Sequence, residues 1–307
     1  MQRLTVSATS HALNYLPAYL ADADGLFARR DLDVAFVARD PWTGVLDDLA
    51  DGIADVALGG LWVPAMYAGS ATQFTTFAQV NHQFPKALVV RDDLSADGEF
   101  SWTTMEGATI LAPGIGGSAP YAFTAGLMRE AGVDPRSATF LRDLSTPMFL
   151  DLFRGGLGDA IVLDLPNALA AQRRGNGRIA VDYTVSGGLG PNSVFYTRQD
   201  RFIELLPVLT AFVDALGEAM ELLETARVED LAPLMAEHWP TADPAHLAQS
   251  CARLQASQTW ATARIDSAAT DRWLRILLEE KMIAHPLAYE DLVDESALVT
   301  SAALSAG

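Results

Sequence analysis

The sequence predicts an α/β fold with two lobes, each organised around its own sheet. Strands alternate with helices through the first sixty residues, and the same alternation returns over residues 108–182. A polar, turn-rich stretch, residues 92–106, separates the two series. Alternation of this kind makes a parallel sheet, whose ligands bind at the carboxyl ends of the strands. We therefore expect the functional residues at that edge of each sheet.

The first lobe is expected to begin with an apolar strand over residues 4–8, followed by a helix that runs from Pro17 to Gly25. Proline suits the first turn of a helix, because its missing N–H would have no partner there. Glycine suits the left-handed position just past a helix end. The other strands expected here cover residues 32–37, 54–59, 75–80 and 87–90.

The second lobe is expected to alternate in the same way. Its predicted strands cover residues 108–112, 139–141, 160–163 and 178–182, and its predicted helices cover residues 118–131, 147–153 and 166–173. The Gly- and Pro-rich stretch 186–191 predicts the return crossing to the first lobe.

The last third of the chain is expected to be helical, because apolar residues recur at helical spacing from Leu206 to Leu223. We expect these C-terminal helices to pack on the first lobe. The predicted first lobe is therefore discontinuous, with residues 1–90 and 188–307, and the inserted second lobe covers residues 91–187.

Several short motifs occur in a characteristic order: NYLPAYLA at 14–21, GLF at 25–27, DV at 33–34, GIADVA at 52–57 and PLAYEDLVD at 286–294. In order and spacing they resemble the NMT1/THI5-like, or SsuA/TauA-like, family of ABC-transporter substrate-binding proteins. The resemblance covers nearly the whole chain and implies a type II periplasmic-binding-protein fold. In that fold a small ligand is held in a cleft between two lobes that close about a hinge.

Composition excludes several classes of partner. The net charge is −18, with only two lysines, which argues against a nucleic-acid partner. No stretch approaches the ~20 apolar residues that a membrane span needs. The single cysteine, Cys251, excludes an internal disulfide and any multi-cysteine metal site. No two histidines have ligand spacing with a carboxylate, so we expect neither a metal nor a cofactor.

The candidate ligand-binding residues follow predicted strands or precede predicted helices. In the first lobe they are Ser10, His11, Asn14, Trp42, Gly59, Gly60, Trp62 and His82. In the second lobe they are Gly116, Gly117, Ser118 and Asp164.

The Gly116-Gly117-Ser118 turn is the most suggestive of these candidates. Its glycines let the backbone approach a ligand, and the free N–H groups of a helix start favour negative charge. Ser118 is expected either to cap the helix or to donate to a carboxylate or sulfonate. Asp164 has the same two alternatives, as a ligand acceptor or as the cap of the helix that follows it.

The aromatic and histidine candidates also have two interpretations each. Trp62 and Trp42 could form an aromatic wall, with Gly59 and Gly60 leaving open space beside Trp62, or they could pack on a helix start. His11 and His82 could donate to an anionic ligand or act as acid or base, or they could bond to the loop backbone. The histidines of the helical last third, His238, His246 and His285, are expected to be exposed or satisfied locally.

The expected function is the binding of a small organic solute, sulfonate-, carboxylate- or pyrimidine-like, without catalysis. The alternative is a cytoplasmic lyase or hydrolase on the same scaffold that acts on a small aromatic or heterocyclic acid, with His11 as general base. Two known enzymes of this fold do not fit. The thiamine-pyrimidine synthase needs a CCCFC motif, and the desulfinase needs a nucleophilic cysteine after the first strand, where this chain has Ser10 and His11.

The N-terminus bears on location and partners. Residues 1–3 lead directly into the first strand, with no charged start, apolar run or cleavage site of a signal peptide. We therefore expect a cytoplasmic protein if Met1 is the native start. If a signal sequence has been removed, we expect a periplasmic or cell-surface protein whose partner is an ABC permease.

Overall fold

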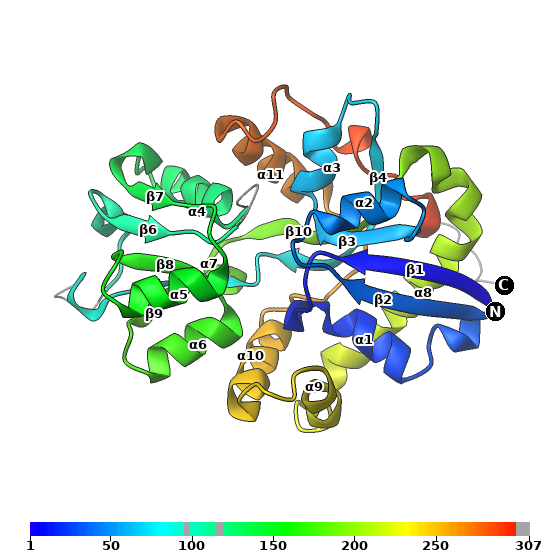
Figure 1. Cartoon of the computed structure of the whole chain (residues 1–307), viewed down its shortest axis with the longest axis horizontal. Coiled ribbons are helices and arrows are strands. Elements are labelled where there is room, and N and C mark those ends of the chain that lie inside the picture. The colour runs from blue at the N-terminus through cyan, green and yellow to red at the C-terminus, as the bar shows by residue number, and fades with distance from the viewer. Residues whose placement is uncertain (95–98, 115–118, 299–307) are drawn as a thin grey trace. The chain divides into compact units, whose positions relative to one another are not determined.

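The computed structural model describes residues 1–94, 99–114 and 119–298, which form two compact units. Unit 1 comprises Met1–His82, Leu189–Leu274 and the chain from Ile283 onward, and unit 2 comprises Gln83–Gly188 and Arg275–Met282. Each unit consists of one sheet with helices packed against it (Figure 1). The fold class is α/β, as the sequence predicts.

Unit 1 is built on a five-stranded sheet in the order β2-β1-β3-β10-β4. Its strands are β1 Gln2–Ala8, β2 Leu32–Ala38, β3 Val56–Gly60, β4 Phe74–Gln83 and β10 Leu189–Arg198. β1 is parallel to β2 and β3, whereas β10 is antiparallel to β3, with Ser193 opposite Gly60. The sheet is therefore mixed rather than parallel throughout, because the chain enters β10 at the carboxyl edge of the other strands.

Seven helices of the described chain have residues in unit 1. They are α1 Leu16–Ala23, α2 Gly44–Ala50, α3 Trp62–Tyr67, α8 Phe202–Thr225, α9 Ala232–His238, α10 Pro244–Ala256 and the first eight residues of α11 Ser267–Glu279. The exit from α1 is confirmed: Gly25 has φ +65°, and the Leu26 N–H donates to the Ala21 carbonyl at 2.8 Å. 

The apolar stripe of α8 is also confirmed as core, with Leu209, Phe212 and Leu216 fully buried. The Phe212 ring stacks on Phe27, with centroids 5.2 Å apart, and so joins α8 to the segment that follows α1. No helix within the described residues has both the length and the apolarity needed to cross a bilayer.

Unit 2 is built on a second five-stranded sheet, in the order β7-β6-β8-β5-β9. Its strands are β5 Lys86–Val90, β6 Thr109–Leu111, β7 Thr139–Leu141, β8 Ala160–Asp164 and β9 Arg178–Asp182. Its helices in the described chain are α4 Ala119–Glu130, α5 Thr146–Arg154, α6 Leu165–Arg173, α7 Tyr183–Ser186 and the end of α11.

The unit boundaries differ from the expected division into 1–90 with 188–307 and 91–187. Residues 87–90 lie in unit 2, because β5 pairs antiparallel with β8 on one side and with β9 on the other. The chain from Arg275 to Met282 also belongs to unit 2, because the end of α11 packs closely on α4. A Cβ built on Gly126 of α4 would lie 2.6 Å from Ile276 Cδ1, so glycine permits this approach.

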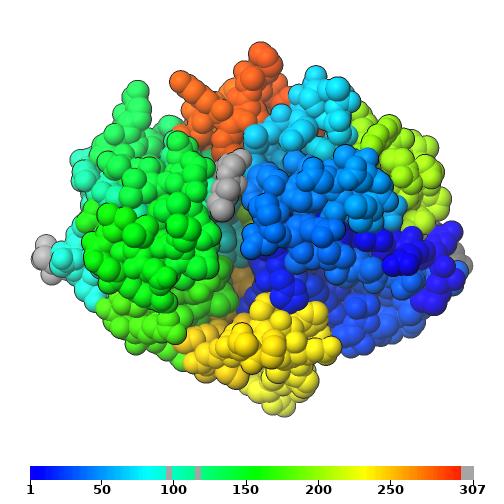
Figure 2. Space-filling view, viewed as in Figure 1, coloured from blue at the N-terminus to red at the C-terminus, as the bar shows by residue number. Residues whose placement is uncertain are grey.

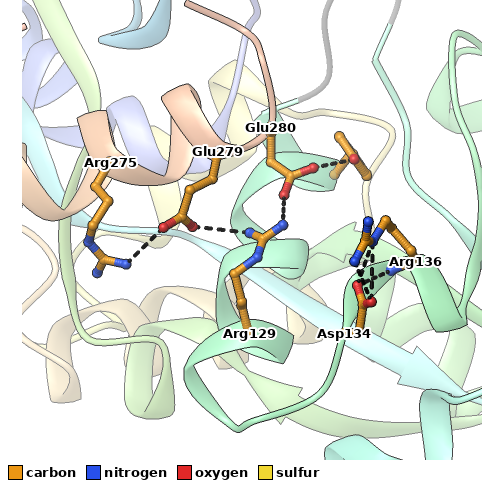
Figure 3. A network of polar contacts seen from close by, with 7 residues as sticks. Arg129, Asp134, Arg136, Arg275, Glu279 and Glu280 are labelled. Atoms are coloured by element: carbon orange, nitrogen blue, oxygen red, sulfur yellow. Dashed lines mark hydrogen bonds and ion pairs between the residues drawn. The ribbon is translucent and has the colours of Figure 1, made fainter. Parts of the chain in front are cut away.

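Ion pairs hold the end of α11 on α4 (Figure 3). The Arg129 guanidinium contacts Glu279 at 3.2 Å and Glu280 at 2.5 Å. The Glu280 side chain is only 5% exposed, and it also accepts a hydrogen bond from the Tyr121 hydroxyl. Burial and the adjacent Glu280 carboxylate raise the pKa of Tyr121 to about 12. The Glu280 oxygens therefore have a charged donor in Arg129 and a neutral donor in Tyr121, which compensates for their burial.

Candidate functional site

Polar side chains from four separate segments meet at the carboxyl edge of the unit 1 sheet. The Ser193 hydroxyl, at the start of β10, accepts from Asn192 Nδ2 at 2.9 Å and from Asn14 Nδ2 at 3.4 Å. The Ser193 backbone N–H donates to Asn81 Oδ1 at 3.1 Å. Asn14 is held in turn by its carbonyl, which accepts from the Trp260 indole N–H at 3.0 Å. The sheet therefore brings neutral amide and hydroxyl groups together.

Asn81 is the most unusual member of this cluster. Asn81 is fully buried near the end of β4, and its Oδ1 accepts the hydrogen bond from the Ser193 backbone N–H. Its Nδ2 has no hydrogen-bond partner among the described residues. Buried donors are almost always paired, and an unpaired one costs about 1–3 kcal/mol. The Asn81 amide is thus a donor that lacks its acceptor.

A second group of hydroxyls lies over Gly59. The Thr9 hydroxyl is 3.2 Å from the Tyr15 hydroxyl, and a Cβ built on Gly59 would lie 2.7 Å from Thr9 Cγ2. The buried Tyr196 hydroxyl has no hydrogen-bond partner in the described chain. Glycine is required at position 59 because these side chains occupy the space above it. Ser10, directly after Thr9, is exposed.

The two candidate tryptophans contact each other, but the open space expected beside Trp62 is not present. Their rings meet edge to face with centroids 4.9 Å apart. Trp62 is only 9% exposed, and a Cβ built on Gly60 would lie 2.2 Å from its Nε1. The expectation is wrong here because the indole itself fills the space that Gly60 leaves. Trp42 is half-buried and is the more exposed ring of the two.

Arg39 directly follows β2 and forms an ion pair with Asp48. Its Nε and Nη2 donate to the two oxygens of Asp48, at 2.6 and 2.7 Å. The buried Asp48 carboxylate also accepts from the Ser7 hydroxyl at 2.5 Å. The hydrogen bonds from Arg39, followed by that from Ser7, hold the pKa of Asp48 below its usual range. Arg39 therefore acts as a structural partner of Asp48.

His11 uses both ring nitrogens within the protein. Its Nε2 lies 3.1 Å from the His238 carbonyl oxygen, and its Nδ1 lies 3.2 Å from the Tyr19 hydroxyl. Because a carbonyl only accepts, Nε2 carries the hydrogen, and Nδ1 accepts from Tyr19. The His11 ring also lies 5.1 Å from that of Trp239. Figure 2 shows the yellow atoms of α9 against the blue atoms of the N-terminal part of the chain.

His238 was expected to be exposed or satisfied locally, and that expectation is wrong. Its ring stacks on Tyr19 with centroids 4.3 Å apart and on His11 with centroids 5.2 Å apart. Burial and the neighbouring His11 lower the pKa of His238. The contact forms because α9 returns to α1, which no local pattern in the sequence indicates.

His82 and Asp164 both bond to nearby backbone. The half-buried His82 ring bonds to the backbone of Gln258, and burial lowers the pKa of His82. Asp164 caps α6: its Oδ1 accepts from the Asn167 N–H and its Oδ2 from Asn167 Nδ2, both at 2.9 Å. These bonds do not test a role in ligand binding, which remains a prediction for both residues.

The remaining candidates, Gly116, Gly117 and Ser118, lie outside the described residues. Within the described ranges, no group of three or more His, Cys, Asp and Glu side chains could hold a metal ion. Cys251 is fully buried in α10, and burial raises the pKa of its thiol to about 12.

Three residues of this cluster are not among the candidates that the sequence predicts: Asn81, Asn192 and Ser193. Asn81 lies one residue before His82, and the Asn192-Ser193 pair directly follows the Gly/Pro-rich stretch. A signal was present for the two asparagines, because a carboxamide that a strand buries needs a specific hydrogen-bond partner. What the sequence did not indicate is that β4 and β10 are neighbours.

Comparison with known proteins places this geometry in context. A protein-family model described as NMT1/THI5 like matches residues 12–224. The Bacillus subtilis protein YtlA, which carries the provisional name of a binding protein, is 23% identical over 251 residues, covering 80% of this chain and 73% of YtlA.

Two solved structures illustrate the similarity in fold. The alkanesulfonate-binding protein SsuA from Xanthomonas axonopodis pv. citri, bound to MOPS, has a TM-score of 0.74 and 18% identity, covering 96% of this chain and 98% of SsuA. The periplasmic nitrate-binding protein NrtA from Synechocystis PCC 6803 has a TM-score of 0.73 and 12% identity, covering 99% of this chain and 89% of NrtA.

Proposed function

Because the chain belongs to the NMT1/THI5-like family, we propose that it is a substrate-binding protein of an ABC importer and binds a small organic anion without catalysis. The observation that supports this proposal is the neutral, donor-rich cluster at the carboxyl edge of the unit 1 sheet. Asn14 and Asn192 each lie within hydrogen-bond distance of the Ser193 hydroxyl, and the adjoining Asn81 amide has a free donor among the described residues.

The ligand class follows from the chemistry of the cluster. Amide and hydroxyl donors suit the oxygen atoms of a sulfonate, carboxylate or pyrimidine carbonyl. The half-buried Trp42 beside Trp62 suits an alkyl or ring portion of the same ligand. SsuA is named for alkanesulfonates and NrtA for nitrate, which are both oxyanions, and this agrees with the proposed class.

The proposed partner is an ABC permease, and the proposed location is outside the cytoplasm. NrtA is named as a periplasmic protein, and a substrate-binding protein of an importer works on the same side of the membrane as its permease's entrance. Fractionation of cells that express the full-length native gene would test this location. Recovery with cytoplasmic markers alone would contradict it.

The alternative, an enzyme with His11 as general base, has less support. Both His11 nitrogens have partners within the protein, at 3.1 and 3.2 Å. A general base needs a free lone pair within reach of the substrate proton, and the His11 lone pair is directed at Tyr19. The single thiol, Cys251, is buried and protonated at neutral pH, so it does not supply a nucleophile.

The test combines binding with a search for product. Purified protein is titrated by calorimetry with MOPS, ethanesulfonate, nitrate, benzoate and a hydroxymethylpyrimidine, and each mixture is then analysed by mass spectrometry after long incubation. We expect saturable binding of at least one compound, which is recovered intact. Conversion of a bound compound to product would overturn the proposal in favour of an enzyme.

A further inference from the structure

The orientation of the Asn81 carboxamide is determined by its surroundings. Asn81 is fully buried on β4, and its Oδ1 accepts from the Ser193 backbone N–H at 3.1 Å. The reverse orientation would place the amide NH₂ against that N–H, so that two donors would face each other. The NH₂ group therefore lies on the opposite side of the carboxamide, where it has no hydrogen-bond partner among the described residues.

Two groups at the Ser193 site are left with hydrogens to donate. The Ser193 hydroxyl has two lone pairs, and these accept from Asn14 and Asn192. Its own hydrogen is left to donate, as are the two hydrogens of Asn81 Nδ2. All four side chains are formally neutral. Buried hydrogens without an acceptor, in neutral surroundings, are complementary to an atom that accepts hydrogen bonds.

We infer that Asn81 determines the specificity of the unit 1 site, by donating from Nδ2 to an oxygen atom of the bound ligand. The inference rests on the proposed binding function and adds to it the hydrogen-bond donor that recognises the ligand oxygen. A ligand with an acceptor oxygen at this position pairs the amide, whereas an analogue without one leaves a buried donor unpaired and is rejected. Recognition at this point uses a neutral amide and does not require an arginine or lysine.

The decisive variant is Asn81→Asp. The aspartate keeps an oxygen for the Ser193 N–H but loses the NH₂ donor and, when ionised, presents negative charge to the ligand oxygen. When protonated, the same carboxyl group can donate again. We expect the affinity of Asn81→Asp for the anion that binds wild type to fall by about 10- to 100-fold at high pH and to recover partly at low pH. The wild-type affinity should change little over the same range. A purely structural role for Asn81 would not predict that the affinity of the variant recovers at low pH.

Thr76→Val is the matched control. Thr76 lies on the same strand, is fully buried, and its hydroxyl also lacks a hydrogen-bond partner among the described residues. It sits at the other end of β4, where its backbone bonds to Leu292 and Asp294. Removing its hydroxyl should leave ligand affinity unchanged at every pH.

The probes are MOPS, ethanesulfonate, nitrate and benzoate, titrated into wild type and both variants. If Asn81→Asp binds as wild type does at all pH values, the inference is overturned and the proposed function stands. If wild type binds none of the four, both are overturned. Should Asn81→Asp not fold, a crystal structure of wild type with its ligand decides: a ligand oxygen bonded to Asn81 Nδ2 supports the inference, and a retained water molecule there refutes it.

Discussion

His11 and His238 stack with their ring centroids 5.2 Å apart, although 227 positions separate them in the chain. The stack joins the loop after β1 to the end of α9. Its two rings belong to the side chains most sensitive to pH near neutrality. Because burial and the His11 ring lower the pKa of His238, we expect the stability of unit 1 to depend on pH.

We expect acidification through the range of free histidine, about pH 6.5, to destabilise the protein partly through His238. Burial and His11 lower the pKa of His238, while Asp22 and Glu237 oppose that shift. Below the unfolded-state pKa, the unfolded chain binds a proton that folded His238 resists, so stability is lost as pH falls. Burial raises the pKa of Asp22, so protonation of this carboxyl group stabilises the folded protein as pH falls. This opposite effect on stability occurs at the lower pH where carboxyl groups titrate. Melting temperatures across this range should depend less on pH in His238→Gln than in wild type.

His285→Gln is the control for that experiment, because His285 is exposed. It should reproduce the pH dependence of wild type. An equally steep dependence in His238→Gln would show that the stack does not contribute. His82, whose pKa burial also lowers, should account for part of the slope that remains.

Gly60→Ala should destabilise unit 1 by about 1–3 kcal/mol, because the added Cβ would lie 2.2 Å from Trp62 Nε1. Gly217→Ala in α8 is the matched control. A Cβ at Gly217 meets nothing within 4 Å, and alanine is the better helix former, so this change should be neutral or stabilising by up to about 1 kcal/mol. Urea unfolding of both variants measures the difference. A Gly60→Ala protein as stable as wild type would mean that Trp62 can move away.

Asp48→Asn should cost about 1–3 kcal/mol, because Arg39 loses its ionic partner while the Asp48 site stays buried. The exposed neighbour Asp47 provides the control, since Asp47→Asn should change stability by less than about 0.5 kcal/mol. A cycle with Arg39→Gln isolates the pair. Additive effects of the two changes would show that the ion pair adds nothing. Because the pKa of Asp48 is depressed, its contribution is present above the unfolded carboxyl range and is lost as pH falls through the folded value.

Glu280→Gln should lower the pKa of Tyr121 from about 12 towards that of free tyrosine, because it removes the negative charge beside the hydroxyl. Burial is the larger cause of the shift, so only part of it should disappear. Titration of phenolate absorbance, compared with a Tyr121→Phe variant to assign the signal, measures the change. Glu279→Gln should leave the value near 12, because Glu279 contacts Arg129 and Arg275. Equal effects of the two variants would refute the assignment.

Local patterns in the sequence were sufficient for most elements of the fold. Short apolar runs located β1 and β8, helical spacing of apolar residues located α8, and Gly25 marked the end of α1, because each signal depends on contacts within a few residues. The spacing of short motifs also identified the family. These signals are local, so the sequence carries them without reference to the rest of the chain.

The tertiary structure decided which distant segments become neighbours. The sequence predicts a strand over residues 87–90, but its place between β8 and β9 depends on pairing partners seventy or more positions away. The same holds for His11 with His238, and for Asn81 with Ser193, which are 112 positions apart. The free donor of Asn81 exists only because β4 and β10 bury the side chain and occupy its oxygen. In an unfolded chain, water would bond to both the oxygen and the nitrogen of the Asn81 amide. The sequence alone therefore determined that position 81 carries a carboxamide, and the fold determined that its nitrogen has no acceptor among the described residues.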